Sequence, residues 1–307
     1  MAQHHDVIVI GCGITGLNAA RHALRSGMTT AVVEGQFVGG LVLNINHLDG
    51  EFSGSGMDHA TDLMSEILDL GAVSVSATTT AIRHEGQRLV AVTDAGEFAG
   101  RAIIVASGAR LKRLGIPGEA ELEERGVSRC ADCDGPLYQN QDVVVVGGGD
   151  SALQEALVLA QFARKVHLVH RGAHFRARAH LVEQVAAARN IETLWRTQVL
   201  NVLGDQSVQA VRLRKLDDAT TRDIACAGFF AYVGLEPASE FVPAAALRDP
   251  SGFLLTDTHM RTGLAGLFAA GAVRAGYAGL LSHAVAEGIA AADAAIAGLR
   301  SQVMRTA

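Results

Sequence analysis

The sequence predicts an α/β fold that contains two Rossmann-like dinucleotide-binding domains. The first observation is a short, largely β-branched run, residues 6–10, that leads directly into a glycine-rich turn, an arrangement that residues 142–146 repeat. The second is that the two units align without a gap: the spacing from Gly11 to Glu34 in the first unit equals the spacing from Gly147 to His170 in the second. The third is the length of 307 residues, which is enough for two domains of about 150 residues each.

Composition excludes several broad classes of protein. Hydrophobic residues make up 49% of the chain, which is too many for an intrinsically disordered segment. The formal net charge of −6 offers no basic surface to nucleic acid, and no uncharged apolar run reaches the roughly 18 residues of a membrane span. The chain begins without the basic region and cleavage site of a signal peptide, so we expect a cytoplasmic protein with no nucleic-acid or membrane partner.

The first unit has the βαβ order of a dinucleotide site. The strand at 6–10 is followed by the turn 11–16, a helical stretch 17–26, and a second strand 29–33 that closes with Glu34. Glycines in such a turn let a pyrophosphate approach the backbone N–H groups at the start of the helix, and a carboxylate after the second strand accepts hydrogen bonds from ribose hydroxyls. The residues predicted to line this site are Gly11, Gly13, Ile14, Thr15, Gly16 and Glu34.

The second unit repeats this order and differs where its second strand ends. After the strand at 165–169 the chain continues with His170 and Arg171, at the position where the first unit has Glu34. An arginine there matches the oxygens of a 2′-phosphate, whereas a carboxylate would repel them, so this site is predicted to prefer NADPH to NADH. The alternative is that the arginines are solvated loop charges. The residues predicted to line the site are Gly147, Gly149, Asp150, Ser151, Ala152, His170, Arg171 and Arg176.

Two of the four cysteines, Cys130 and Cys133, form a C-x-x-C motif. A zinc site needs about four ligands, and this motif lacks a second pair, so a reversible redox dithiol is favoured over zinc and over a structural or vestigial pair. Since a flavin usually carries electrons between a nicotinamide and a disulfide, the first site is predicted to hold FAD. Asp134 follows directly and is a candidate for proton exchange, or alternatively orders the turn at 134–136.

These motifs resemble the low-molecular-weight thioredoxin reductases, a group within the pyridine nucleotide-disulfide oxidoreductases, over nearly the whole chain. The most specific feature of the resemblance is the position of the cysteine pair just before the second glycine turn. The resemblance adds further residues to the predicted FAD site, namely Gly35, Gly39, Gly40, Ser107, Gly108, Gly271 and the neighbouring Ala272.

The resemblance implies a three-layer ββα architecture and a domain arrangement. It implies an FAD-binding domain in two segments, 1–109 and 241–307, with an NADPH-binding domain that carries the redox motif inserted at 110–240. Cys133 would then face the flavin, and Cys130 would exchange with thioredoxin or a similar dithiol or disulfide substrate. Members of the group are homodimers, so the resemblance also implies a homodimer.

The chain departs from the pattern of this group at both cofactor sites. Ala272 stands where a carboxylate normally holds the flavin ribityl chain, and one lost hydrogen bond to a charged group corresponds to roughly one to two decades in FAD affinity. Gly172 removes one basic phosphate donor, which weakens the preference for NADPH without reversing it. Asp132 places a carboxylate between the cysteines, where its charge disfavours their thiolate forms.

The leading hypothesis is an NADPH-dependent disulfide reductase in which electrons pass through FAD to Cys130 and Cys133 and on to thioredoxin or a similar substrate. In the flavin loop, Leu41 follows Gly39 and Gly40 where the group has a glutamine. This change and the missing phosphate donor at Gly172 motivate an alternative, a flavin-dependent oxidase that closes a disulfide in a small molecule and reduces oxygen. Ala272 motivates a second alternative, a non-catalytic homologue with an impaired FAD site. Thioredoxin-dependent consumption of NADPH, dithiol-dependent uptake of oxygen, and loss of FAD distinguish the three.

Overall fold

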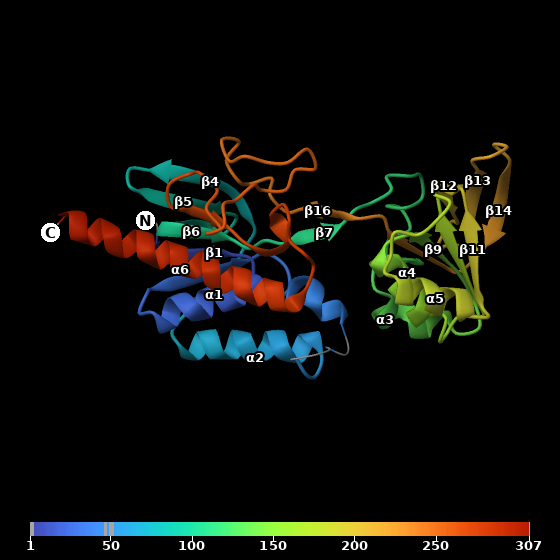
Figure 1. The fold of residues 1–307 in the computed structure, drawn as a ribbon, viewed down its shortest axis with the longest axis horizontal. Helices are drawn as coiled ribbons and strands as arrows, with labels where there is room; N and C mark the ends of the chain where they lie inside the picture. Colours follow the sequence, from blue (N-terminus) through green and yellow to red (C-terminus); the bar gives the residue numbers. More distant parts are fainter. Residues whose placement is uncertain (1–2, 46–47, 49–51, 307) are drawn as a thin grey trace. The chain divides into compact units, whose positions relative to one another are not determined.

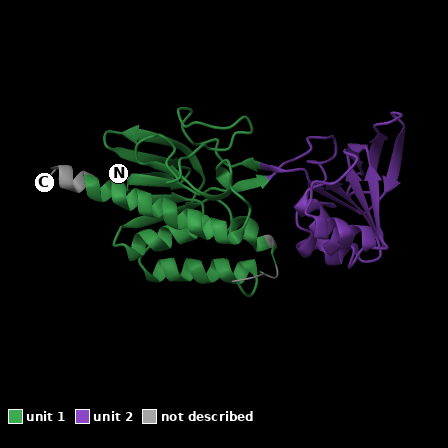
Figure 2. Cartoon of the chain, in the orientation of Figure 1, with its two compact units in different colours: residues 1–110, 236–307 green, residues 111–235 purple. Residues whose placement is uncertain are grey.

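The structure, a computed structural model, describes residues 3–45, 48 and 52–306. The chain divides into two compact units (Figure 2). Unit 1 comprises residues 1–110 and 236–307, and unit 2 comprises residues 111–235. Among the described helices, none has both the length and the apolar character that a membrane span requires.

The chain passes from one unit to the other twice. The first passage runs through β7 (Ala109–Leu111) and the second through β16 (Leu235–Pro237). These two strands pair as a two-stranded sheet (Figure 1), and the Lys112 amide donates to the Gly234 carbonyl at 2.9 Å. The two ends of unit 2 are therefore neighbours in space.

Unit 1 is built on a seven-stranded sheet. Its strands are β1 (Gln3–Ile10), β2 (Thr30–Glu34), β3 (Val73–Ser76), β4 (Thr79–Glu85), β5 (Arg88–Thr93), β6 (Gly96–Val105) and β17 (Leu267–Ala269). The order is β3-β2-β1-β6-β5-β4, with β17 also paired to β6. Because β1, β2, β3, β6 and β17 run parallel, the residues that follow them meet at one edge of the sheet.

Helices cover one face of this sheet (Figure 1). They are α1 (Ile14–Arg25), α2 (Gly56–Asp69) and α6 (Leu281–Thr306), with short 3-10 turns η1 (Gly40–Asn44) and η3 (Gly271–Val273) elsewhere in the unit. Val7 and Val9 of β1 pack into the core on the helical side, whereas Ile8 and Ile10 pack into a second core on the opposite face. The strand is thus buried on both faces, which is why its sequence is a continuous apolar run.

Unit 2 is built on a five-stranded parallel sheet with the order β11-β10-β9-β15-β8. Its strands are β8 (Val127–Ser128), β9 (Asp142–Gly147), β10 (Lys165–His170), β11 (Ile191–Trp195) and β15 (Gly228–Tyr232). A separate antiparallel sheet contains β12 (Thr197–Leu203), β13 (Ala210–Lys215) and β14 (Thr221–Ala225). The helical elements are α3 (Ala131–Asp134), η2 (Gly135–Tyr138), α4 (Asp150–Leu159) and α5 (Ala179–Ala187).

The central strand of unit 2 repeats the burial pattern of β1. Val143 and Val145 pack into the core that contains residues of α4 and α5, and Val144 and Val146 pack into the core shared with β12 and β13. Two Rossmann-like units with parallel sheets confirm the predicted α/β fold class.

The element boundaries differ from those predicted at two helices. α1 begins at Ile14 rather than at residue 17, so the last three residues of the predicted turn form its first helical turn. The sequence predicts a helix to about residue 163, but α4 ends at Leu159, because the chain tightens there: the amides of Gln161 and Phe162 donate to carbonyls three residues back, at 3.1 and 3.0 Å. Both differences lie at helix ends, where local sequence signals are weakest.

Candidate active site

Cys130 and Cys133 form a disulfide at the start of α3, with their Cα atoms 5.3 Å apart. Cys130 precedes the helix in an extended conformation, and its Sγ accepts a hydrogen bond from the Cys133 amide at 3.1 Å. Cys133 is exposed, whereas Cys130 is partly buried. One helical turn therefore holds both sulfur atoms at bonding distance and leaves the motif accessible to thiol–disulfide exchange.

Asp134, the residue after Cys133, closes α3. Its amide donates to the Cys130 carbonyl at 3.1 Å, so the helix fixes it beside the disulfide. Burial, followed by the negative charge of Asp134, raises the pKa of Tyr138 to about 12. The partly exposed carboxylate of Asp134 thus lies close enough to Tyr138 to act on it and directly follows the cysteine pair in the chain, and its role in proton exchange stays a prediction.

Glu155 and Tyr232 hold the start of α3, and sequence reasoning did not find either of them. Glu155 Oε2 accepts hydrogen bonds from the Ala131 amide at 3.1 Å and from the Tyr232 hydroxyl at 3.3 Å. The only local signal for Glu155 was a carboxylate in a largely apolar helix. Tyr232 reaches it from β15, 77 residues further along the chain, a distance over which no local pattern operates.

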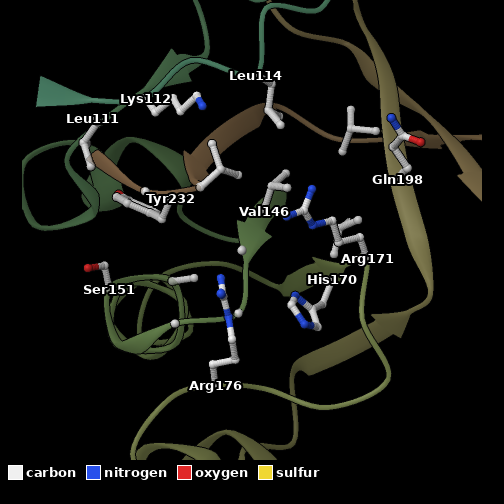
Figure 3. Close-up of a pocket in the computed structure, with 18 of the residues that line it drawn as sticks. Leu111, Lys112, Leu114, Val146, Ser151, His170, Arg171, Arg176, Gln198 and Tyr232 are labelled. Carbon is white, nitrogen blue, oxygen red and sulfur yellow. The ribbon is translucent and has the colours of Figure 1, made fainter. Parts of the chain in front are cut away.

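The second glycine turn opens onto a cavity of about 510 Å³ within unit 2 (Figure 3). α4 begins after Gly149 without a side-chain cap, which leaves its first backbone N–H groups to bind a phosphate. The turn itself is tightly packed, because a Cβ on Gly147 would lie 2.5 Å from the Tyr232 carbonyl oxygen. The structure brings every residue predicted for this site to the cavity: Gly147, Gly149, Asp150, Ser151, Ala152, His170, Arg171 and Arg176.

Positive charge dominates the lining of this cavity. Its cationic side chains are Lys112, Arg113, Arg171 and Arg176. Among the described residues that line it, the one carboxylate is that of Asp150, which accepts hydrogen bonds from the amide and the Nε of Arg178 at 2.8 and 2.6 Å. Sequence reasoning missed Lys112 and Arg113, because they come from the segment after β7 and lie outside both βαβ units. The lining suits a ligand that carries several phosphate charges.

His170 is buried, and its ring packs against the glycine turn. Its Nε2 lies 3.1 Å from the His174 carbonyl oxygen, and a Cβ on Gly148 would lie 2.2 Å from its ring. The amide of Arg176 donates to the Gly148 carbonyl at 2.8 Å. These contacts fix the loop 171–176 against the glycine turn, which places both predicted arginines at the cavity.

The first glycine turn lies in unit 1 between β1 and α1. As in unit 2, the helix starts without a side-chain cap, here after Gly13. A Cβ on Gly11 would lie 2.3 Å from the Ala106 carbonyl oxygen, and one on Gly16 would lie 1.9 Å from the Gly11 carbonyl oxygen. Only glycine lets the strand, the neighbouring β6 and the helix approach so closely, and the N–H groups of residues 14–16, which no capping side chain occupies, fit a pyrophosphate.

Glu34, the last residue of β2, lies beside this turn. Its two carboxylate oxygens accept hydrogen bonds from the amides of Cys12 at 2.8 Å and Gln36 at 2.9 Å. A carboxylate has about four acceptor sites, so capacity remains for ribose hydroxyls. The Gly39 amide donates to the Cys12 carbonyl at 2.7 Å and brings Gly40 and η1 to the same place. Burial and the charge of Glu34 raise the pKa of the Cys12 thiol to about 12, which makes it a packing residue.

Ser107 and Gly108 lie where the chain leaves β6. The Ser107 hydroxyl donates to the Ala238 carbonyl at 2.6 Å, and the Ala238 amide donates to the Gly108 carbonyl at 3.0 Å. At Gly35 a Cβ would lie 2.6 Å from the Thr78 hydroxyl oxygen. These contacts explain why the positions are small or polar within unit 1, and their contact with FAD stays a prediction.

Ala272 supplies no carboxylate to the predicted FAD site, and the carboxylate nearest in the fold is that of Glu287. Gly271 has a φ of +75°, and a Cβ there would lie 2.4 Å from the Thr15 hydroxyl oxygen. Its amide donates to Glu287 at 2.8 Å, and Arg274 forms a mostly buried ion pair with the same carboxylate at 2.6 Å. The glycine turn of unit 1 therefore fits a dinucleotide, whereas the Glu287 carboxylate is already neutralised by an arginine.

Comparison with known proteins decides the family. The model of the pyridine nucleotide-disulphide oxidoreductases matches residues 5–288. The chain belongs to this family. The thioredoxin reductase of Treponema pallidum is 36% identical over 300 residues, which cover 96% of this chain and 97% of the relative. The thioredoxin reductase of Listeria innocua is 36% identical over 276 residues, which cover 88% of this chain and 86% of the relative.

Solved structures of this family have the same fold. The crystal structure of Lactococcus lactis thioredoxin reductase matches with a TM-score of 0.91 and 34% identity, over 97% of this chain and 99% of that one. The T. acidophilum thioredoxin reductase matches with a TM-score of 0.88 and 26% identity, over 96% and 98% of the two chains. The protein is a flavoprotein disulfide reductase of the thioredoxin reductase family, with a redox-active disulfide at Cys130 and Cys133. Members of this family typically bind FAD and NAD(P)H.

Proposed function

We propose that this enzyme uses NADPH to reduce the disulfide of thioredoxin, or of a similar partner, through FAD and the Cys130–Cys133 pair. Unit 1 is the proposed FAD domain and unit 2 the proposed NADPH domain. The observation that carries the proposal is that the redox disulfide and the arginine-lined cavity of about 510 Å³ belong to the same compact unit. The names of the relatives support thioredoxin as the partner. The homodimer and the cytoplasmic location stay predictions.

The residues of the chain divide the chemistry between them. The uncapped start of α4 receives the pyrophosphate, while Arg171 and Arg176 provide fixed positive charge for a 2′-phosphate. FAD, when bound to unit 1, supplies the two-electron relay between a nicotinamide and a disulfide. After two-electron reduction, a thiolate of the Cys130–Cys133 pair attacks the substrate disulfide, and the second cysteine resolves the mixed disulfide, which releases the reduced substrate.

Turnover with a defined partner tests this proposal. Flavin-replete protein is expected to consume one NADPH for each thioredoxin disulfide that it reduces, and Cys133→Ser is expected to abolish this activity. Flavin-replete protein that consumes no NADPH with thioredoxin would exclude thioredoxin reduction. Oxygen uptake with a small dithiol and without NADPH would establish the oxidase alternative instead. Failure to retain FAD through gel filtration would support the non-catalytic alternative.

The two arginines at the cavity predict the choice of nucleotide. Loss of a hydrogen bond to a charged group costs about 1.5 to 3 kcal/mol, so Arg171→Ala or Arg176→Ala should raise the KM for NADPH roughly 10- to 100-fold. The KM for NADH should change less than about 2-fold, because that nucleotide has no 2′-phosphate. Arg189→Ala, an exposed arginine of the same unit, is the matched control. Equal losses with both nucleotides would show that the arginines do not bind the 2′-phosphate.

A further inference from the structure

A half-buried carboxylate, that of Glu155, accepts a hydrogen bond from the first residue of α3, the helix that carries the redox motif, and the proposed electron path does not use it. Glu155 Oε2 lies 3.1 Å from the amide nitrogen of Ala131, and the peptide bond of that nitrogen joins it to Cys130. Ala131 is fully buried, and Tyr232, which donates to the same oxygen, is 7% exposed. The carboxylate is therefore coupled to the cysteine motif through one peptide group, and both residues that donate to it are buried.

The surroundings of Glu155 bring the pKa of its carboxyl group close to physiological pH. Burial is the largest effect and, with the negative charge of Asp132 on α3, raises the pKa of Glu155 to about 7. The hydrogen bonds from Ala131 and Tyr232 act in the opposite direction, because they stabilise the carboxylate. Among the described residues, no lysine or arginine forms an ion pair with Glu155. A small change in local charge therefore changes its protonation.

We propose that Glu155 binds a proton when the Cys130–Cys133 disulfide is reduced and releases it when the disulfide re-forms. Reduction adds two electrons and breaks the S–S bond, which leaves one thiol and one thiolate after uptake of one proton. The new negative charge arises on the cysteine motif whose Ala131 amide donates to the Glu155 carboxylate, and it favours protonation of that carboxylate, so a second proton is taken up there. Two electrons and two protons are thus gained in total, and both protons are available when the pair is reoxidised by its substrate.

Protonation of Glu155 removes the repulsion between its carboxylate and the thiolate. A protonated Glu155 still has an oxygen that accepts the hydrogen bond from Ala131, so the start of α3 stays in place. Glu155 is in this sense a positioning residue for the cysteines. The inference rests on redox cycling of Cys130 and Cys133 and is independent of which nucleotide or partner the enzyme uses.

The pH dependence of the disulfide equilibrium tests the inference. Full-length protein is equilibrated with mixtures of reduced and oxidised dithiothreitol at a series of pH values, and alkylation followed by mass spectrometry measures the reduced fraction of Cys130 and Cys133. Oxidation of dithiothreitol itself releases two protons, so the measured ratios are first converted to the reduction equilibrium of the cysteine pair alone. In the range just above pH 7, where Glu155 is charged in the oxidised protein, its proton uptake lowers this equilibrium constant by a further factor of about ten for each unit rise in pH. Glu155→Gln keeps the acceptor oxygen and should lose this added factor.

Matched variants separate proton uptake from a merely structural role. Tyr232→Phe removes a donor that stabilises the carboxylate, so the steep range should move to higher pH, while the exposed Glu183→Gln should leave it unchanged. Reduced-minus-oxidised infrared spectra should show a protonated carboxyl band that Glu155→Gln lacks. An equal pH dependence in the wild type and Glu155→Gln would overturn the proposal. If Glu155→Gln fails to fold, a range that Tyr232→Phe does not move would overturn it equally.

Discussion

At the scale of single residues, neighbouring glycines of the second turn have different reasons for being glycine. A Cβ on Gly148 would lie 2.2 Å from the ring of His170, which is itself held by the His174 carbonyl. A Cβ on Gly149, one residue further, meets no atom within 4 Å, and the backbone there has a φ of −100° that any residue adopts. Packing inside the protein therefore requires glycine at position 148. No contact within the protein requires glycine at position 149, so a bound ligand is the remaining reason for it.

This contrast predicts different effects of two adjacent substitutions. Gly148→Ala should lower the free energy of unfolding by about 1–3 kcal/mol, because the added methyl group must displace the His170 ring. Gly149→Ala should change it by less than about 0.5 kcal/mol. The single tryptophan of the chain, Trp195, lies with its ring centroid 5.8 Å from that of His170, so its fluorescence in a urea titration reports on this region. Equal destabilisation by the two substitutions would contradict the argument.

Site residues that belong to one βαβ motif could be predicted from the sequence. Residues that come together from distant parts of the chain could not. Arg171 and Arg176 could be predicted because a strand, a glycine turn and the next strand lie within about thirty residues of one another, and both units have the same spacing. Glu155 and Tyr232 meet only because β15 pairs with β9, and that pairing is long-range. The same limit explains why Lys112 was missed at the cavity.

At the scale of elements, three adjacent strands of unit 2 hold a buried histidine between two carboxylates. His167 of β10 is 7% exposed, with its ring nitrogens 3.9 Å from Asp142 of β9 and 3.3 Å from Glu192 of β11. Burial is the main cause that lowers the pKa of His167, and the charge of Lys165 adds to it, while the two carboxylates oppose it. The net result is a histidine that the folded sheet keeps neutral.

Acid is therefore expected to destabilise unit 2. An unfolded chain binds a proton at His167 once the pH falls below about 6.5, whereas the folded sheet resists it, so stability is lost as the pH falls through this range by up to about 1.4 kcal/mol per pH unit. His167→Asn should flatten this slope in urea titrations followed by Trp195 fluorescence. His180→Asn, an exposed histidine of the same unit, should leave the slope as it is. An unchanged slope in His167→Asn would assign the acid sensitivity to other groups.

At the scale of the whole molecule, each unit has its own pair of hydrophobic cores, and the chain connects the units only at β7 and β16. Two-state unfolding is an approximation that such a molecule need not satisfy. The cores could be predicted from the apolar strands, because each strand is buried on both faces within its own unit. The predicted homodimer depends on a surface between chains and had no comparable signal.

The two units are expected to respond separately to their nucleotides. NADP⁺ at about 100 times its Kd should stabilise unit 2 by about 2.7 kcal/mol, and should raise the temperature at which Trp195 fluorescence reports unfolding. FAD should instead raise the transition of unit 1, which calorimetry detects and Trp195 does not. A single transition that either nucleotide raises would show that the units unfold as one.

The pairing of β7 with β16 has a consequence for how such enzymes diversify. The two ends of unit 2 lie side by side. Residues 111–235 therefore form a cassette that can be lost, gained or exchanged in evolution without a change in the positions of residues 110 and 236 within unit 1. The cysteine pair, Glu155 and the arginine-lined cavity all belong to this cassette. With unit 2 as the proposed NADPH domain, preference for an electron donor and the chemistry of the disulfide are inherited together, separately from the flavin side.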